Sequence, residues 1–347
     1  RLRAVTQELA QRLRDVGLAV DRMNLGVFAL HPEMAGYAVL WDSSMEQAIE
    51  VAVRREDTLT PTYLDSPIRW LVEHGGSVHY DLQDTEDLKH FGVLHEFADD
   101  GYRHYYGFCI RYGGQGTAVL SLCTREEQGF DAATIASLER IFPALRLVIN
   151  LVETRRLAET VLETYLGRDT SKMVLSGKIL RGEGESIEAA LWLCDLRDFT
   201  AMTSAMGAAA VIETMNNYFD AMAEAIWAEG GEILKFMGDA MLVVFRIGAG
   251  AGPADVARRA VAAAIAAQER LQQLSERRLV QGLKPLRAGI AVHIGTVVYG
   301  NIGASRRLDF TVMGHSVNVV ARMQNLTSET GEPVLFSGAV AQHLTAP

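Results

Sequence analysis

The chain of 347 residues is longer than a typical single domain, so we expect two domains. Its 33 basic and 43 acidic side chains give a formal net charge of -10, which argues against a general nucleic-acid or anionic-membrane surface. The three cysteines are too scattered for a disulfide framework, no signal peptide is visible, and no apolar run approaches the roughly 20 residues that cross a bilayer. We therefore expect a cytoplasmic protein.

The N-terminal half opens with a predicted helix over residues 4–16, which Gly17 stops. Short apolar and aromatic runs between about 24 and 125 then predict an antiparallel sheet, with an inserted helix that begins at Ser66-Pro67. Residues 130–152 are helical again. This succession, and above all the segment HYYGFCIRYGGQGTAVLSLCTREEQGF, resembles GAF sensor domains more closely than the PAS pattern. The resemblance carries no ligand signature, so it implies a sensor with an unknown ligand at 1–137.

Residues 138–180 form the predicted connector. Its apolar residues alternate at spacings of four and three, which is typical of a two-stranded coiled-coil seam, and they are Leu138, Phe142, Leu145, Ile149 and Val152. After Arg155-Arg156 the apolar positions resume in another phase at Leu157, Val161 and Tyr165. A single amphipathic helix packed on its own domain explains the first run equally well. Gly167 predicts the end of the helix, and GKILRGEGES links it to the next domain.

The C-terminal half, 181–347, begins with a predicted strand at 188–195 and a helix along an apolar stripe from Val211 to Ile226. EILKF and AMLVVF then flank Met237-Gly238-Asp239 as a hairpin. Further predicted elements are a helix at 254–275, a strand at 287–294, short strands in GTVVYGNIG and DFTVMG, a helix at 314–327 and the strand PVLFS. This order predicts an α+β fold with a ferredoxin-like sheet and helices on one side of it.

Polar residues fall at the ends of these elements. Asp195 ends an apolar strand and Asp239 lies at the hairpin tip, and a carboxylate pair on one sheet suits divalent cations such as Mg²⁺. Residues 196–200 present backbone N–H groups before a helix, which favours phosphate. Asn318 and Arg322 share one face of the helix after Gly314, where an amide and a guanidinium suit a sugar and a phosphate.

Three motifs in order, D-L-R-D-F-T, K-F-M-G-D and R-L-D-F-T-V-M-G-H-S-V-N-V-V-A-R-M, resemble the catalytic domain of class III adenylate and guanylate cyclases over about 185–340. The resemblance implies that Asp195 and Asp239 hold two Mg²⁺ ions, for which Mn²⁺ can substitute. It implies catalytic roles for Asn318 and Arg322 at the transition state. It further implies substrate binding by Lys235, Thr311, Leu196, Arg197, Asp198, Phe199, Thr200 and Gly238.

The predicted purine-recognition pair is Lys235 with Thr311, whereas guanylate-specific family members carry Glu and Cys there. Lys can donate to adenine N1 and Thr can accept from the 6-amino group, so the expected reaction converts ATP to 3′,5′-cyclic AMP and pyrophosphate. The resemblance also implies a head-to-tail homodimer, in which the aspartates of one chain meet the purine and transition-state residues of the other. A dimeric connector helix fits that arrangement.

Three departures from the family pattern stand out. Asp198 takes a position where Gly is frequent, His315 one where Asn or Asp is common, and a phosphate-contacting Lys of the family is expected beyond Pro347. Gly230-Gly231-Glu232 suggests a diguanylate cyclase, but those domains continue with Glu-Phe and this chain does not. The alternative that stays open is a catalytically silent cyclase-like module for dimerisation or ligand sensing.

Overall fold

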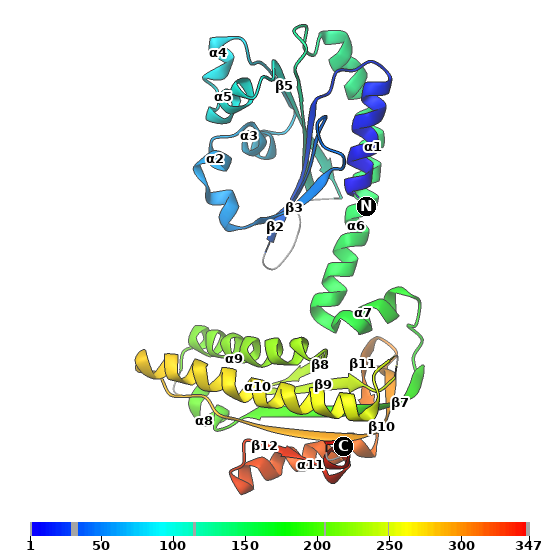
Figure 1. The fold of residues 1–347 in the computed structure, drawn as a ribbon, viewed down its shortest axis with the longest axis vertical. Coiled ribbons are helices and arrows are strands. Elements are labelled where there is room, and N and C mark those ends of the chain that lie inside the picture. The colour runs from blue at the N-terminus through cyan, green and yellow to red at the C-terminus, as the bar shows by residue number, and fades with distance from the viewer. Residues whose placement is uncertain (1, 29–33, 114–115, 205, 249, 345–347) are drawn as a thin grey trace. The chain divides into compact units, whose positions relative to one another are not determined.

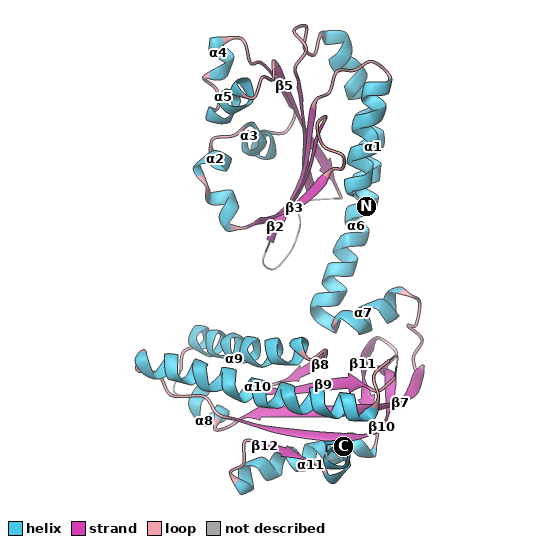
Figure 2. Ribbon diagram, viewed as in Figure 1, coloured by secondary structure: helices cyan, strands magenta, loops and turns pink. Residues whose placement is uncertain are grey.

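The computed structural model describes residues 2–28, 34–113, 116–204, 206–248 and 250–344. The chain divides into two compact units, Arg1–Thr160 and Val161–Pro347, and the division falls inside helix α6, Ala132–Leu166 (Figures 1 and 2). The domain boundaries expected near 137 and 180 therefore remain predictions. Among the described residues, no helix combines the length and the apolar character needed to span a bilayer.

The N-terminal unit is built on a six-stranded antiparallel sheet with strand order β3-β2-β1-β6-β5-β4. Its strands are β1 Arg22–Phe28, β2 Met34–Asp42, β3 Ile49–Arg54, β4 Ser77–Asp81, β5 His104–Tyr112 and β6 Gly116–Thr124. Its helices, besides α6, are α1 Leu2–Asp15, the 3-10 turn Glu56–Leu59, α2 Pro61–Leu64, α3 Pro67–His74, α4 Thr85–Leu88 and α5 Gly92–Asp99. Figure 1 shows α1 and α6 on one face of the sheet and α2 to α5 on the other.

Local signals in the sequence set several of these boundaries. The Ser66 side chain accepts a hydrogen bond from the Arg69 N–H at 3.2 Å, and Pro67 occupies the first turn of α3, as predicted. Helix α1 ends at Asp15, and Gly17 then adopts a φ of 87°, a left-handed conformation that Gly takes without strain. Helix α6 ends at Leu166, immediately before Gly167.

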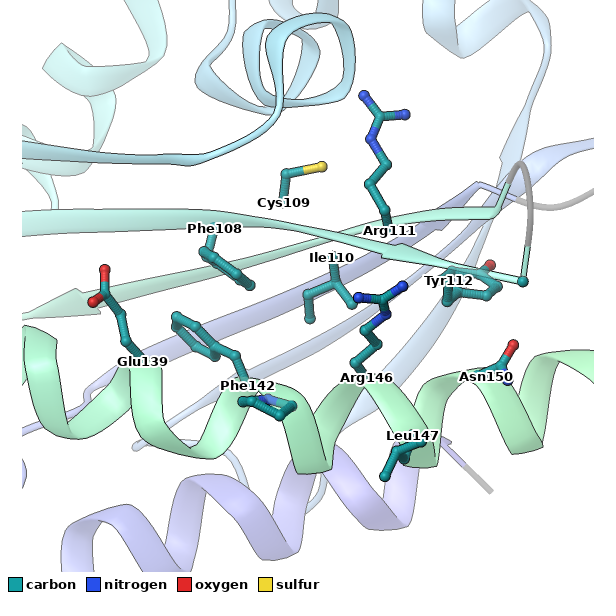
Figure 3. A pocket seen from close by; sticks show the side chains of 12 residues that line it. Phe108, Cys109, Ile110, Arg111, Tyr112, Glu139, Phe142, Arg146, Leu147 and Asn150 are labelled. Atoms are coloured by element: carbon teal, nitrogen blue, oxygen red, sulfur yellow. The ribbon is translucent and has the colours of Figure 1, made fainter.

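The first half of α6 packs into the core of the N-terminal unit. Leu138, Phe142, Leu145 and Ile149 are buried there. Figure 3 shows Phe142 facing Phe108 of β5 beside a cavity of about 810 Å³, and the two ring centroids are 3.7 Å apart. These positions match a coiled-coil seam in spacing, but they serve as the apolar face of a helix packed on its own unit.

The C-terminal unit contains a sheet of order β11-β10-β7-β9-β8, with β12 parallel to β10. Its strands are β7 Gly184–Leu196, β8 Glu232–Met237, β9 Ala240–Arg246, β10 Ala288–Ala304, β11 Arg307–Met313 and β12 Val334–Phe336. Its helices are α7 Arg168–Leu175, α8 Phe199–Thr203, α9 Ala208–Ala228, α10 Pro253–Val280, α11 His315–Thr330 and α12 Gly338–Leu344. β7, α9, β8, β9, α10 and β10 thus follow the predicted order of strands and helices.

Two details of this unit differ from the predictions. Helices α9 and α10 cover one face of the sheet, but α11 packs on the other, because β7 is apolar on both sides: Trp192 joins one core and Leu191 the other. The strands expected at 287–294 and in GTVVYGNIG form one strand, β10. Its pairing with β7 continues without a break through Gly295, which lies opposite Ala189.

Candidate active site

Asp195 and Asp239 lie at neighbouring strand ends. Asp195 is near the end of β7, and Asp239 follows Gly238, whose φ of 68° forms the turn between β8 and β9. Because β7 pairs with β9 up to Cys194 opposite Met241, the two carboxylates are adjacent. Burial and, second, the Asp239 carboxyl raise the pKa of Asp195 to about 6.

The environment of Asp195 fits a bound cation. Its Oδ1 atom is buried and finds no hydrogen-bond partner among the residues that the structure describes. A buried carboxylate beside a second one is unfavourable unless a proton or a cation compensates the charge. No described group of three or more His, Cys, Asp or Glu side chains could hold a metal ion, so a cation at this place would have only the two aspartates as carboxylate ligands. Mg²⁺ suits such a set, because it retains waters and substrate oxygens.

Lys235, on β8, forms an ion pair with Asp309 on β11. Side chains alternate between the two faces of a strand, so Asp309 and Thr311 share one face of β11. The structure thus brings Lys235 to the strand that carries Thr311, within one chain. Sequence reasoning missed Asp309, although it stands two residues before Thr311 in the motif R-L-D-F-T.

Asn318 and Arg322 are exposed on α11. They lie about 200° around the helix from the buried residues Ser316 and Val320, and so on the side away from the sheet. Neither side chain forms a hydrogen bond or an ion pair within the described part of the chain. In particular, no such contact joins them to Asp195, Asp239 or Lys235, so the structure does not assemble all the predicted site residues in one protomer.

The turn at 196–200 differs from the predicted phosphate cradle. The Arg197 N–H donates to the Arg287 carbonyl at 2.7 Å, and its guanidinium donates to the Thr327 and Glu332 carbonyls at 2.7 and 2.8 Å. Arg197 therefore fastens the end of α11 to the sheet. The Leu196 N–H is directed at the Asp195 carboxylate. These contacts leave Asp198, Phe199 and Thr200 as the segment whose N–H groups remain for a phosphate.

Asp198 combines an unusual backbone with an exposed side chain. Its φ of 60° is positive, which no other non-glycine residue shows among those described. Gly adopts this conformation readily and Asp tolerates it, so the geometry explains why Gly suits the position. The carboxylate is 77% exposed and lies 3.5 Å from an Arg287 nitrogen, so it faces solvent. His315, the second departure, is the first residue of α11.

Comparisons with known proteins relate the C-terminal unit to nucleotide cyclases. Residues 185–346 match the family model described as the adenylate and guanylate cyclase catalytic domain. An adenylate cyclase of Anabaena cylindrica is 34% identical over 170 residues, which are 48% of this chain and 32% of the relative. Adenylate cyclase 1 of Rhizobium meliloti (strain 1021) is 34% identical over 155 residues, 44% of this chain and 23% of the relative.

The chain therefore spans about a third or less of the length of these two relatives. A solved bacterial light-regulated adenylyl cyclase shares the fold, with a TM-score of 0.51 and 21% identity over 76% of this chain and 85% of that one. Residues 185–346, which are just under half of this chain, therefore match the family of adenylate and guanylate cyclase catalytic domains.

Proposed function

We propose that this chain is a cytoplasmic adenylate cyclase, which converts ATP to 3′,5′-cyclic AMP and pyrophosphate at the interface of a homodimer. The observation that carries the proposal is the Asp195–Asp239 pair: burial and the neighbouring Asp239 carboxyl raise the pKa of Asp195, and its Oδ1 atom has no partner among the described residues. The relatives named adenylate cyclase support ATP as substrate, as does the Lys235 and Thr311 pair.

In the proposed reaction, the ribose 3′-oxygen attacks the α-phosphorus and the bond to the β-phosphate oxygen breaks, releasing pyrophosphate. Mg²⁺, or Mn²⁺ in its place, would be held by Asp195 and Asp239 and would lower the pKa of the 3′-hydroxyl and offset the triphosphate charge. Lys235 donates to adenine N1, and Asp309 holds its ammonium beside Thr311, which accepts from the 6-amino group.

The remaining residues act on the sugar and the phosphates. Asn318 orients the ribose, and Arg322 offsets the charge that develops on the α-phosphate. The N–H groups of 198–200 face the triphosphate. No general base is assigned to the protein, because proton loss from an activated hydroxyl to water suffices.

The dimer follows from the placement of these groups. Asn318 and Arg322 face solvent from α11, whereas Asp195 lies half-buried at the end of a central strand. Lys235 and Asp239 are only four residues apart on one hairpin, too close to bind opposite ends of one ATP. A second copy, arranged head to tail, would bring its own Lys235, Asn318 and Arg322 to the aspartates of the first and complete two sites.

A second apolar stripe on α6 supports dimerisation through the connector. It repeats at spacings of four and three, and its members are Leu147, Leu151, Thr154, Ala158, Val161 and Tyr165. Leu147 and Leu151 are 70% and 73% exposed, and Val161 and Tyr165 are 44% and 81% exposed. Figure 3 shows Leu147 projecting from the side of α6 away from β5. We assign the coiled-coil seam of the 138–180 connector to this stripe instead of the one first expected.

The sheet topology of each unit supports a fold type for each proposed domain. The strand order β10-β7-β9-β8 with α9 and α10 on one face supports a ferredoxin-like catalytic domain at 181–347. The antiparallel sheet between two helical layers supports a GAF-like sensor at 1–137. Regulation of the cyclase by that sensor is part of the proposal.

The decisive experiment is complementation. An Asp195→Ala chain and an Arg322→Ala chain should each be inactive, and their 1:1 mixture should recover about a quarter of wild-type cyclic AMP production, since half of the dimers carry one intact site. A mixture of two Asp195→Ala preparations is the control. Absence of product from the wild type with both Mg-ATP and Mn-ATP would favour the silent module, and absence of complementation alone would refute the composite site.

The seam has its own test. Leu151→Glu should weaken dimerisation in sedimentation experiments while the monomer stays folded, because Leu151 is exposed. Leu145→Ala should instead cost about 2–5 kcal/mol of stability, because Leu145 is buried in the core. Equal dimerisation of wild type and Leu151→Glu would reject the seam.

A further inference from the structure

The face of the N-terminal sheet that α2 to α5 cover has an unusual polar floor. Along β1, Met23, Leu25 and Val27 point into the core beneath α1 and α6 and are 0%, 1% and 2% exposed. The alternate positions, Arg22 and Asn24, point to the opposite face. A sheet that helices cover on both faces normally carries apolar side chains on both faces. The charged Arg22 and the amide of Asn24 therefore need hydrogen-bond partners on this face.

Strand pairing extends this floor across three strands. Arg22 pairs with Cys123 and through it with Tyr105, and Asn24 pairs with Ser121 and through it with Gly107. A side chain at Gly107 would meet the Tyr105 ring and hydroxyl at 3.0 and 3.2 Å. The absence of a side chain at Gly107 therefore leaves room for the Tyr105 ring to lie along the sheet, with its hydroxyl near Gly107.

A cavity of about 290 Å³ opens over this floor, lined by Arg22, Asn24, Tyr105 and Ser121, with Phe97 and Asp57 among its other walls. Tyr105 is 1% exposed, and the Ser121 side chain lies close enough to its hydroxyl to lower its pKa, yet no described residue bonds to that hydroxyl with ordinary geometry. The Asn24 Oδ1 atom is likewise buried and without a partner in that part of the chain. Two unsatisfied polar groups at one cavity are costly unless something in the cavity bonds to them.

The charged and polar groups at the cavity indicate which chemical groups its occupant must carry. The Arg22 guanidinium lies 5.5 Å from the centre of the Phe97 ring and forms no ion pair with a described carboxylate, so it can receive an anion. Asn24 Oδ1 requires a donor, and the neutral Tyr105 hydroxyl, whose pKa burial raises further, can donate. Asp57, whose carboxylate accepts from the Arg54 N–H at 2.6 Å, adds a negative charge at the wall.

We propose that this cavity binds a small carboxylate that also carries a hydrogen-bond donor, the chemistry of a free amino acid. The carboxylate bonds to Arg22 and Tyr105, the amine donates to Asn24 and faces Asp57, and the side chain packs against Phe97. A volume of about 290 Å³ is just below the roughly 300–1,000 Å³ typical of ligand pockets, which suits a molecule as small as an amino acid. The proposal deepens the sensor role proposed above and rests on it only for its biological purpose.

The test measures binding to the whole chain and needs no cyclase turnover, so it can fail independently of the proposed reaction. The probes are the twenty free amino acids and, for each hit, the same acid without its amine. We expect at least one amino acid to raise the unfolding temperature and its amine-free counterpart to bind at least tenfold more weakly. Absence of any stabilising amino acid, together with no small molecule in a denaturing extract analysed by mass spectrometry, would overturn the proposal and leave a water-filled cavity.

Two substitutions tie such binding to the cavity. In calorimetric titration, Arg22→Gln should lower the affinity for the stabilising amino acid by roughly 10–100-fold, and Tyr105→Phe should lower it by about 3–10-fold. Arg140→Gln, which removes an exposed arginine of α6, is the matched control and should bind as the wild type does. Tyr105→Phe without ligand should be about as stable as the wild type, because the hydroxyl it removes forms no hydrogen bond of ordinary geometry with a described residue. Unchanged binding in both cavity variants would place the ligand elsewhere and refute the site.

Discussion

The two ends of the β8–β9 hairpin carry half-buried carboxylates that differ in one respect. At its base, Glu232 accepts hydrogen bonds from the Thr170 N–H and the Tyr299 hydroxyl, both at 3.0 Å. At its tip, Asp239 lies against Asp195, which has an oxygen without a partner in the described chain. Burial raises the pKa at both sites. The chain itself satisfies the first carboxylate, which marks a structural contact, whereas the unpaired oxygen at the second is consistent with the proposed cation.

The largest expected effect is at the tip. Asp195→Asn should lower cyclic AMP production by at least about 10²–10³-fold, because it removes a negative charge that the proposed cation needs. The unfolding temperature without metal should stay equal or rise, because the substitution ends the repulsion with Asp239. A thermal melt and a turnover assay on the same preparation check this. If Asp195→Asn were less stable and retained turnover, Asp195 would be the structural carboxylate and not the one that binds the cation.

The base of the hairpin should behave in the opposite way. Glu232→Ala leaves the Thr170 N–H and the Tyr299 hydroxyl without their acceptor and should cost about 1–3 kcal/mol of unfolding free energy in a denaturant titration. Turnover per folded molecule should stay within a few-fold. Glu224→Ala removes a carboxylate from an exposed ion pair with Arg270, and as control it should change stability by less than about 1 kcal/mol.

The pH dependence of stability sharpens the same contrast. The raised pKa of Glu232 means that the folded state favours the neutral acid. Its stabilising contribution is therefore complete below the ordinary Glu pKa of 4.5 and is lost as the pH rises through the higher folded value. Glu232→Gln cannot ionise, so its stability relative to the wild type should increase from pH 4 towards neutrality. A difference that stays constant with pH would show that burial does not raise this pKa.

Asp309 represents an intermediate case, a carboxylate that the chain pairs but that lies at the proposed purine end. Asp309→Asn should raise the KM for ATP by up to about tenfold with a smaller change in kcat, since Lys235 loses its anchor but keeps its charge. Asp220→Asn, on the exposed side of α9, is the control and should leave both constants unchanged. A large fall in kcat instead would assign Asp309 a more direct role.

Asp198 should give the smallest effect, because its carboxylate faces solvent. Asp198→Asn keeps a residue that tolerates positive φ. It should change the free energy of unfolding by less than about 0.5 kcal/mol and should leave the KM for ATP nearly unchanged. Asp198→Ala should cost about 1–2 kcal/mol, because Ala is strained in this conformation. If Asn lowers the KM several-fold, the carboxylate hinders the triphosphate after all.

Sequence reasoning succeeded where neighbouring residues determine the structure. Ser66 and Pro67 begin a helix by their own chemistry, and Gly238 makes the hairpin turn. It failed where distant segments decide. Arg197 bonds to carbonyls about 130 positions away, so no local pattern reveals its role. The two apolar stripes of α6 have the same spacing, and only the packed sheet shows which one the core uses. The roles of the predicted site residues stay predictions until the substitutions above are measured.

The strand order of the C-terminal sheet has a consequence for how the candidate site moves. Asp195 lies on β7, which has a strand on each side, whereas Lys235 and Thr311 lie on β8 and β11, at the two ends of the strand order. Terminal strands lose amide protection through local opening, while central strands exchange mainly on global unfolding. Amide hydrogen exchange should therefore be slow along β7 and faster along β8 and β11. In a cyclase built this way, the central strand β7 would hold the catalytic ions rigidly, and the more mobile terminal strands β8 and β11 would recognise the base.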